Sequence, residues 1–217
     1  MRKKDTLFNR IKDKYRKPVT LTGRHYQIAK KMMLDTTEIM NRHDIDYFLD
    51  AGTLLGMIRD GDLIPWDHDI DMLLPLSEVD KFKSIVPALQ DKNWRVKTDY
   101  PMHHDGPCWK KGAQCNFRMY NNRFYHFGRG RIKLEIYVLY PDGDHCWYHA
   151  MGKNWKLPAV HFKTHAIHIF DGHALRIPAR AEAYLDYIYA DWKTPTPAFN
   201  HLSGDHSIYN TANIWNE

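Results

Sequence analysis

The chain has 217 residues, of which 43% are hydrophobic and 26% are charged, and this is the ordinary composition of a soluble globular protein with one well-buried core. Its three cysteines are an odd and sparse set, which excludes a disulfide framework and favours a reducing compartment. The net charge of +5 favours anionic partners such as nucleotides, phosphorylated glycans, a membrane surface or nucleic acid, although it also serves solubility alone.

Residues 1–20 are predicted to form a basic arm or helix. Between positions 2 and 17, eight Lys or Arg residues stand against two Asp, with a weak apolar stripe at Leu7, Phe8 and Ile11. Such a segment can rest on anionic lipid or remain a solvated helix. No long apolar run follows it, so we expect no secretory signal, no membrane span, and a cytoplasmic protein that is at most peripheral to a membrane.

Residues 21–197 are predicted to form a single domain, and residues 198–217 a C-terminal tail. Hydrophobic periodicity and turn residues define the elements of its first half. These are a helix at 22–41, a buried strand at 46–50, a turn at Gly52-Thr53, a brief helix at 54–59 and a strand at 64–74.

The second half of the domain is predicted to be richer in strands and loops. A capping-box pattern at Ser77 and Asp80 begins a helix that runs to about Leu89. Its remaining elements are a strand at 94–98, an extended loop or insertion at 99–130 with a short strand near 117–120, a core strand at 132–140, a hairpin at 166–177 and a helix at 180–190. The pattern as a whole predicts an α+β fold with a mixed β-sheet flanked by helices and a loop- and hairpin-rich insertion.

Three aspartates at alternate positions, Asp67, Asp69 and Asp71, are the most informative feature of the sequence. Alternate residues of a β-strand point to one face, so these carboxylates would crowd together and repel each other. A cation is the usual reason for tolerating such crowding. Two divalent ions joined by shared carboxylates are a common arrangement for phosphoryl transfer.

Two other interpretations of these aspartates are less favoured. A calcium-binding EF-hand loop needs glycine at its sixth position, where this chain has Met72. A solvated acidic turn does not explain the apolar residues on both sides, Ile64 and the run from Ile70 to Leu74, which indicate a strand entering the core.

Fourteen histidines raise the alternative of a zinc site. His145-Cys146 with His149, or Cys108 with Cys115, could begin one, but the sequence has no CxxC pair and no tight Cys/His quartet. We therefore expect these residues to be surface groups or donors that line a cleft.

The order strand, small turn, short helix and strand with an acidic step resembles the nucleotidyltransferase superfamily. Gly52-Thr53 stands where that pattern has Gly-Ser, and Asp69-Ile70-Asp71-Met72 is the acidic step. Glu135 is the candidate third carboxylate, because its neighbours Leu134 and Ile136 face the other side of their strand. The resemblance implies a nucleotidyltransferase-like core.

The chain resembles one family of this superfamily, the LicD family, which includes fukutin and fukutin-related protein. The blocks from Gly52 to Arg59 and from Ile64 to Asp71 match its central motif, and Tyr189 to Pro195 resembles its C-terminal Tyr-Gly-Asp-Trp-x-Thr-Pro block. The likeness spans roughly residues 25–197. The chain departs from the family pattern at three positions: His68 and Glu135 each stand where the family usually has Asp, and Ala190 stands where it has Gly. Because position 68 would face away from 67, 69 and 71, we expect the metal site to survive.

This resemblance implies transfer of a phospho-alcohol, such as phosphocholine or a polyol phosphate, from a CDP-activated donor to a hydroxyl of a glycan or lipid-linked glycan, with release of CMP. Asp69, Asp71 and Glu135 would hold Mg²⁺ or Mn²⁺ and form the catalytic set, with Asp67 as a further metal ligand through water. Glu135 would complete the second metal position or take the proton of the attacking hydroxyl.

Four residues are predicted to bind the substrate. Gly52 would let the backbone approach the phosphates, Thr53 would donate a hydrogen bond, and Arg59 would offer its planar fork to a phosphate. Trp66 would stack on a base or ring, although a place in the core explains it equally well. Arg59 alone is also consistent with a surface cation, and Glu135 with a half-exposed strand residue.

Two alternative functions remain open at this point. The first is a nucleotidyltransferase that attaches NMP from an NTP to a small molecule, and the second is a glycan- or nucleic-acid-binding module without catalysis. We expect no nucleic-acid partner, and we expect the segments 99–130 and 145–173 to determine the acceptor.

Overall fold

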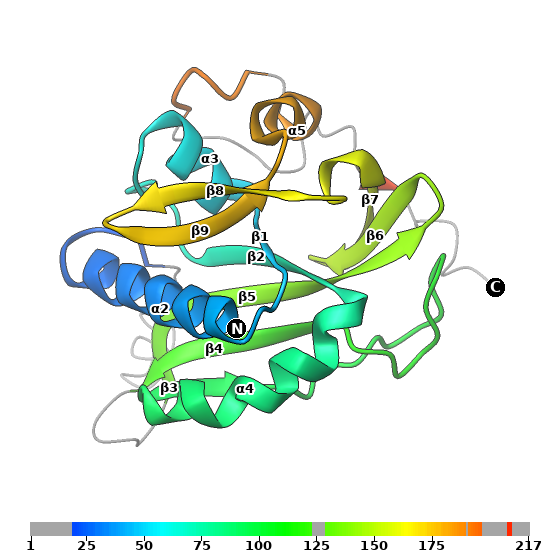
Figure 1. Cartoon of the computed structure of the whole chain (residues 1–217), viewed down its shortest axis with the longest axis horizontal. Helices are drawn as coiled ribbons and strands as arrows, with labels where there is room; N and C mark the ends of the chain where they lie inside the picture. The colour runs from blue at the N-terminus through cyan, green and yellow to red at the C-terminus, as the bar shows by residue number, and fades with distance from the viewer. Residues whose placement is uncertain (1–18, 123–128, 190, 197–207, 210–217) are drawn as a thin grey trace, which may run out of the picture.

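A computed structural model describes residues 19–122, 129–189, 191–196 and 208–209 of the chain (Figure 1). The predicted basic arm therefore lies outside the described residues except for its last two positions. Of the predicted tail, only residues 208 and 209 are described, and they form strand β10 (Ile208–Tyr209). No helix within the described ranges is long and apolar enough to cross a membrane.

The centre of the fold is a mixed β-sheet with the order β1-β2-β5-β6-β7-β10, and β4 and β3 extend it from the other side of β5. Strands β2 and β5 run parallel, whereas the other strand pairs of the described sheet are antiparallel. The predicted α+β class with a mixed sheet is confirmed. The strands are β1 (Phe48–Leu49), β2 (Ile70–Pro75), β3 (Trp94–Lys97), β4 (Asn116–Asn122), β5 (Arg129–Asp142), β6 (His145–Ala150) and β7 (Lys153–Pro158).

Helices flank this sheet in two groups. Helix α2 (Gly23–Arg42) contacts β5 and α4 (Val79–Asp91), and α4 contacts β3. Figure 1 shows α3 (Ala51–Arg59), α5 (Ala181–Ile188) and the hairpin of β8 (His165–Phe170) and β9 (His173–Pro178) gathered near the β1 edge of the sheet. Short 3₁₀ turns, η1 (Leu76–Glu78) and η2 (Ala159–His161), precede α4 and follow β7.

The elements predicted from strong periodicity are present in the structure. Helix α2 buries Ala29, Met32, Met33 and Met40, which lie at helical spacing along its inner face. In the β8–β9 hairpin, Asp171-Gly172 adopts positive φ at both residues, which is the turn geometry that Asp-Gly favours between two strands.

Four predictions of local structure were wrong. The strand of the aspartates begins at Ile70 instead of Ile64, because residues 65–66 form a turn and the carbonyl of Asp67 accepts a hydrogen bond from the Leu21 N–H outside the sheet. Gly52-Thr53 lies in the first turn of α3 instead of in a connecting turn. Residues 76–78 form η1, and α4 follows without a side-chain cap from its N-cap residue. Finally, β6 and β7 occupy a segment for which no strands were predicted.

Candidate active site

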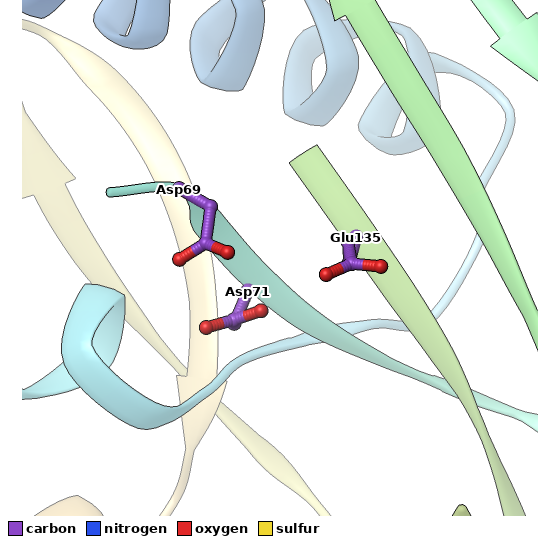
Figure 2. A group of neighbouring side chains, drawn as sticks. All are labelled: Asp69, Asp71 and Glu135. Carbon is purple, nitrogen blue, oxygen red and sulfur yellow. The ribbon is translucent and has the colours of Figure 1, made fainter. Parts of the chain in front are cut away.

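The register between two parallel strands positions the acidic side chains. Asp71 on β2 is the direct neighbour of Glu135 on β5, so both side chains lie on the same face of the sheet. Asp69, which directly precedes β2, joins them, and one carboxylate oxygen from each of the three residues lies within 4.8 Å of the others. Figure 2 shows all three carboxylates on one side of the two strands. The structure thus brings together the three carboxylates that the sequence singled out.

Asp67 lies beside this cluster, although it is not part of a strand. Its carboxylate lines the same cavity and accepts a hydrogen bond from the backbone of His68 at 2.8 Å. A Cβ atom at Gly52 would lie 2.1 Å from Oδ2 of Asp67, so glycine at this position makes room for that carboxylate. His68 is among the residues that line the cavity, and its Nδ1 is 3.0 Å from the carbonyl oxygen of Val19, which does not line it.

Thr53 holds the backbone of the site instead of facing the cavity. It is only 1% exposed, and its Oγ1 accepts a hydrogen bond of 3.0 Å from the N–H of Asp71. A second bond to the same residue comes from Asp50, whose N–H donates to the Asp71 carbonyl oxygen. These two bonds fix β2 against the start of α3.

Asp50 is a buried acidic residue of the cavity that sequence reasoning missed. It is 2% exposed, and Oδ1 of its carboxylate accepts a hydrogen bond of 2.6 Å from the hydroxyl of Tyr184 on α5. Burial and the neighbouring Asp50 raise the pKa of the Tyr184 hydroxyl well above its usual value, so it remains a donor. Nothing in the local sequence around Asp50 or Tyr184 indicates that the two are partners.

Two basic residues, also missed, compensate part of the acidic charge. Lys133 extends its Nζ to 2.8 Å from Oδ2 of Asp69 and pairs with Oε2 of Glu135 as well. Arg118 on β4 is the register partner of Glu135, and its Nε lies 2.6 Å from Oε1. Lys133 stands two residues before Glu135 on one strand, so strand alternation could have indicated it. Arg118 meets Glu135 only through the pairing of β4 with β5.

The site remains strongly acidic in spite of these pairs. Desolvation, followed by the charges of Asp69, Asp67, Glu135 and Asp50, raises the pKa of Asp71 well above its usual value. Burial alone would lower the pKa of Lys133, but the charges of Asp69 and Glu135 outweigh it and raise this pKa. The cluster therefore favours any additional positive charge.

The carboxylates open into a cavity of about 220 Å³. Besides the acidic residues, its lining includes aromatic residues from β5, β6, β7, α5 and the residue after α5. The aromatic residues are Tyr137, Tyr148, Trp155, Tyr184 and Tyr189. A lining that combines charged side chains with aromatic rings suits a substrate that carries both phosphate and a ring.

A second cavity of about 120 Å³ adjoins the first and shares Gly52, Asp67, His68 and Tyr189 with it. The predicted substrate residues Arg59 and Trp66 line this cavity and not the acidic one.

Arg59 is already engaged by protein groups. Its Nε and Nη2 donate to Asp60 at 2.8 and 2.7 Å, its Nη1 donates to the Trp192 carbonyl oxygen at 3.3 Å, and its guanidinium lies over the Trp66 ring. The fork is therefore fixed by Asp60, and its role in phosphate binding stays a prediction.

The donor set fits a hard divalent cation. Asp69, Asp71 and Glu135 offer only carboxylate oxygens, which are the ligands preferred by Mg²⁺ and Mn²⁺. Within the described ranges, this is the one group of three or more His, Cys, Asp or Glu side chains whose ligand atoms lie so close together. The Lys133 ammonium between Asp69 and Glu135 shows that the cluster accommodates a cation.

Comparison with known proteins agrees with this geometry. A profile described as the LicD/FKTN/FKRP nucleotidyltransferase domain matches residues 44–180, which include all three carboxylates. The chain belongs to the LicD/FKTN/FKRP family. The family resemblance noted in the sequence is thereby confirmed.

Several relatives share long segments with the chain. An uncharacterized protein of Rickettsia typhi is 23% identical over 226 residues, which cover 89% of this chain and 68% of that protein. The ribitol-5-phosphate transferase FKTN of Homo sapiens is 22% identical over 178 residues, covering 79% of this chain and 34% of FKTN. The lipopolysaccharide cholinephosphotransferase LicD of Haemophilus influenzae is 38% identical over 66 residues, covering 30% of this chain and 25% of LicD. The chain thus spans about a third of FKTN and a quarter of LicD.

Proposed function

We propose that the protein is a metal-dependent phosphotransferase that moves a phospho-alcohol from a CDP-activated donor to a glycan hydroxyl and releases CMP. The observation that carries this proposal is the parallel register of β2 and β5, which brings Asp69, Asp71 and Glu135 together at the wall of a cavity. Relatives named as ribitol-phosphate and choline-phosphate transferases support the class of reaction.

Asp69, Asp71 and Glu135 would hold Mg²⁺ or Mn²⁺, with Asp67 as a ligand through water. The bound cation would neutralise charge on the diphosphate of the donor and on the departing CMP. Of the two roles considered for Glu135, its place beside the carboxylates of Asp69 and Asp71 supports that of a ligand.

The remaining contributions come from the chain's own side chains. Thr53 holds the backbone of Asp71 in place through its buried hydroxyl, and Gly52 leaves space for the Asp67 carboxylate. The aromatic residues that line the first cavity offer a stacking surface for a ring of donor or acceptor, and the adjoining cavity with Trp66 and Arg59 offers a second place for one. Two neighbouring cavities suit a reaction with two substrates.

The test is CMP release from CDP-choline, CDP-ribitol and CDP-glycerol, with Mg²⁺ or with EDTA, in the presence of oligosaccharide acceptors. We expect Mg²⁺-dependent release that is lost in Asp69→Ala and in Asp71→Ala and kept in Asp99→Ala, a matched control at an exposed carboxylate outside the regular elements. Retained turnover in both site variants would refute the proposal. Pyrophosphate release from an NTP would instead indicate a nucleotidyltransferase, and metal-independent RNA binding without turnover a binding module.

We also propose a cytoplasmic location with peripheral membrane contact through the basic residues between positions 2 and 17. Co-sedimentation with vesicles containing phosphatidylserine tests this contact. We expect binding that falls with added salt and with Lys/Arg→Gln changes in that segment, and equal binding to neutral vesicles would contradict it.

A further inference from the structure

The Lys133 ammonium lies where the acidic cluster is most crowded. Its Nζ is 2.8 Å from Oδ2 of Asp69 and in direct contact with Oε2 of Glu135, and both carboxylates have an oxygen within 4.8 Å of Asp71. The side chain is 31% exposed and lines the cavity, so its end borders open space. A flexible four-carbon stem can carry the ammonium away from the carboxylates without any movement of β5.

The other oxygen of Glu135 is held independently. Its Oε1 lies 2.6 Å from Nε of Arg118 and 3.4 Å from Nδ2 of Asn116, and both of these residues are on β4. The ion pair with Arg118 and the hydrogen bond from Asn116 are both made to Oε1, so neither uses the oxygen that Lys133 contacts. Lys133 contacts the other oxygen of Glu135, Oε2, and its ammonium bridges this oxygen and Oδ2 of Asp69.

A divalent cation bound between Asp69 and Glu135 would occupy the place where the Lys133 ammonium now lies. An ammonium and a metal ion held at contact distance by the same oxygens would repel each other strongly, because both are positively charged and would lie only a few ångströms apart. Protein-bound ammonium and metal therefore compete for one position.

We propose that Lys133 is an internal counter-ion of the acidic cluster that is exchanged for the divalent cation. In the metal-free protein, its ammonium holds Asp69 and Glu135 together. When the metal binds, the ammonium is displaced to the cavity wall, where it faces the space for the donor phosphates and positions them. This inference rests on the proposed metal-dependent function, and it makes Lys133 a positioning residue in addition to the carboxylates.

The exchange has a consequence for metal affinity that does not depend on activity. If the displaced form is the one that binds metal, the apparent affinity is reduced by the small fraction of molecules in that form. Removing the ammonium lifts this competition. We therefore expect Lys133→Met to bind Mn²⁺ about tenfold more tightly than the unmodified chain, which corresponds to a displaced fraction of about a tenth.

Isothermal titration of the full chain with Mn²⁺ measures this change. Lys81→Met is the matched control, because Lys81 is an exposed lysine that also pairs with a carboxylate, that of Glu78, and neither residue lines the cavity; we expect unchanged affinity. Arg118→Met separates exchange from general electrostatics, since it removes an equal charge from the far oxygen of Glu135. Tighter binding in K133M that exceeds any change in R118M supports the exchange, and equal tightening in both, or none in K133M, overturns it.

A second measurement covers the case in which K133M folds poorly. The unmodified chain is acetylated briefly with acetic anhydride, with and without Mg²⁺, and the lysines are quantified by peptide mass spectrometry. We expect Mg²⁺ to raise the labelling of Lys133 severalfold and to leave Lys81 unchanged; unchanged or reduced labelling of Lys133 overturns the exchange. If titration shows no metal binding by the unmodified chain, the proposed function itself fails, whereas metal binding without release of Lys133 refutes only this inference.

Discussion

Asp71→Asn should stabilise the metal-free protein while it abolishes catalysis. Asp71 has carboxylate oxygens of Asp69 and Glu135 within 4.8 Å, and two unit charges at this distance repel each other by about 3.5 kcal/mol at an effective dielectric constant of 20. Lys133 offsets roughly one of these two repulsions. We therefore expect the neutral amide to raise the free energy of unfolding by about 3 kcal/mol at neutral pH.

Thermal unfolding in EDTA at pH 7.5, followed by circular dichroism, measures this effect. For a domain of this size, a gain of about 3 kcal/mol corresponds to a melting temperature higher by about 6–12 °C. Asp99→Asn removes the same charge at an exposed position and should leave the melting temperature unchanged. A melting temperature of Asp71→Asn equal to or below that of the unmodified chain would refute the idea that the cluster is under electrostatic strain.

The pH dependence of the gain gives a second criterion. Because the pKa of Asp71 is raised in the folded state, the folded protein binds a proton there more readily than the unfolded chain does. This group therefore costs stability as pH rises above the pKa of an unfolded Asp, and the cost is complete only above the folded pKa. The advantage of Asp71→Asn should be greatest at neutral pH and should shrink on acidification; a pH-independent gain would contradict the assignment.

Other parts of the site give three further predictions. Gly52→Ala would place a Cβ 2.1 Å from the Asp67 carboxylate, so we expect CMP release to fall by about 10–100-fold in kcat/KM with little loss of helical signal, and an unchanged rate would contradict this. Tyr184→Phe removes a buried hydrogen bond to Asp50 and should lower the free energy of unfolding in urea by about 1.5–3 kcal/mol; a loss within error would show that the bond adds nothing. Burial raises the pKa of the thiols of Cys108, Cys115 and Cys146 to about 11. The folded protein should therefore react slowly with iodoacetamide at pH 8 and progressively faster toward pH 11. Fast labelling at pH 8 would disprove the burial of these thiols.

The sequence predicted the cluster of three carboxylates because its information is local. Alternation around Asp71 and around Glu135 assigns each side chain to one face of a strand, and apolar neighbours such as Leu134 and Ile136 assign the other face to the core. What remained was only whether the two strands are neighbours, and the family resemblance supplied that expectation. The structure confirms that β2 pairs with β5.

The missed features depend on contacts between distant segments. Strands β6 and β7 bury residues without a regular alternation, so the period-2 signal is weak in both. The start of β2 is set by the backbone contact between Leu21 and Asp67, which no local pattern reveals. Arg118 could be assigned to Glu135 only once β4 was known to pair with β5 in that register.

The register of β5 determines the charge arrangement of the whole site. Through its parallel pairing with β2 it places Glu135 beside Asp71, and through its antiparallel pairing with β4 it places Arg118 on the other side of Glu135. If β5 shifted by one residue against its neighbours, Glu135 would turn into the core and Leu134 or Ile136 would face the cavity. Both of these apolar side chains are fully buried in the observed register. The cost of exposing these two apolar side chains, and of burying a carboxylate without its cations, opposes that slip. The apolar face of β5 therefore holds in place the acidic cluster on which the proposed chemistry depends.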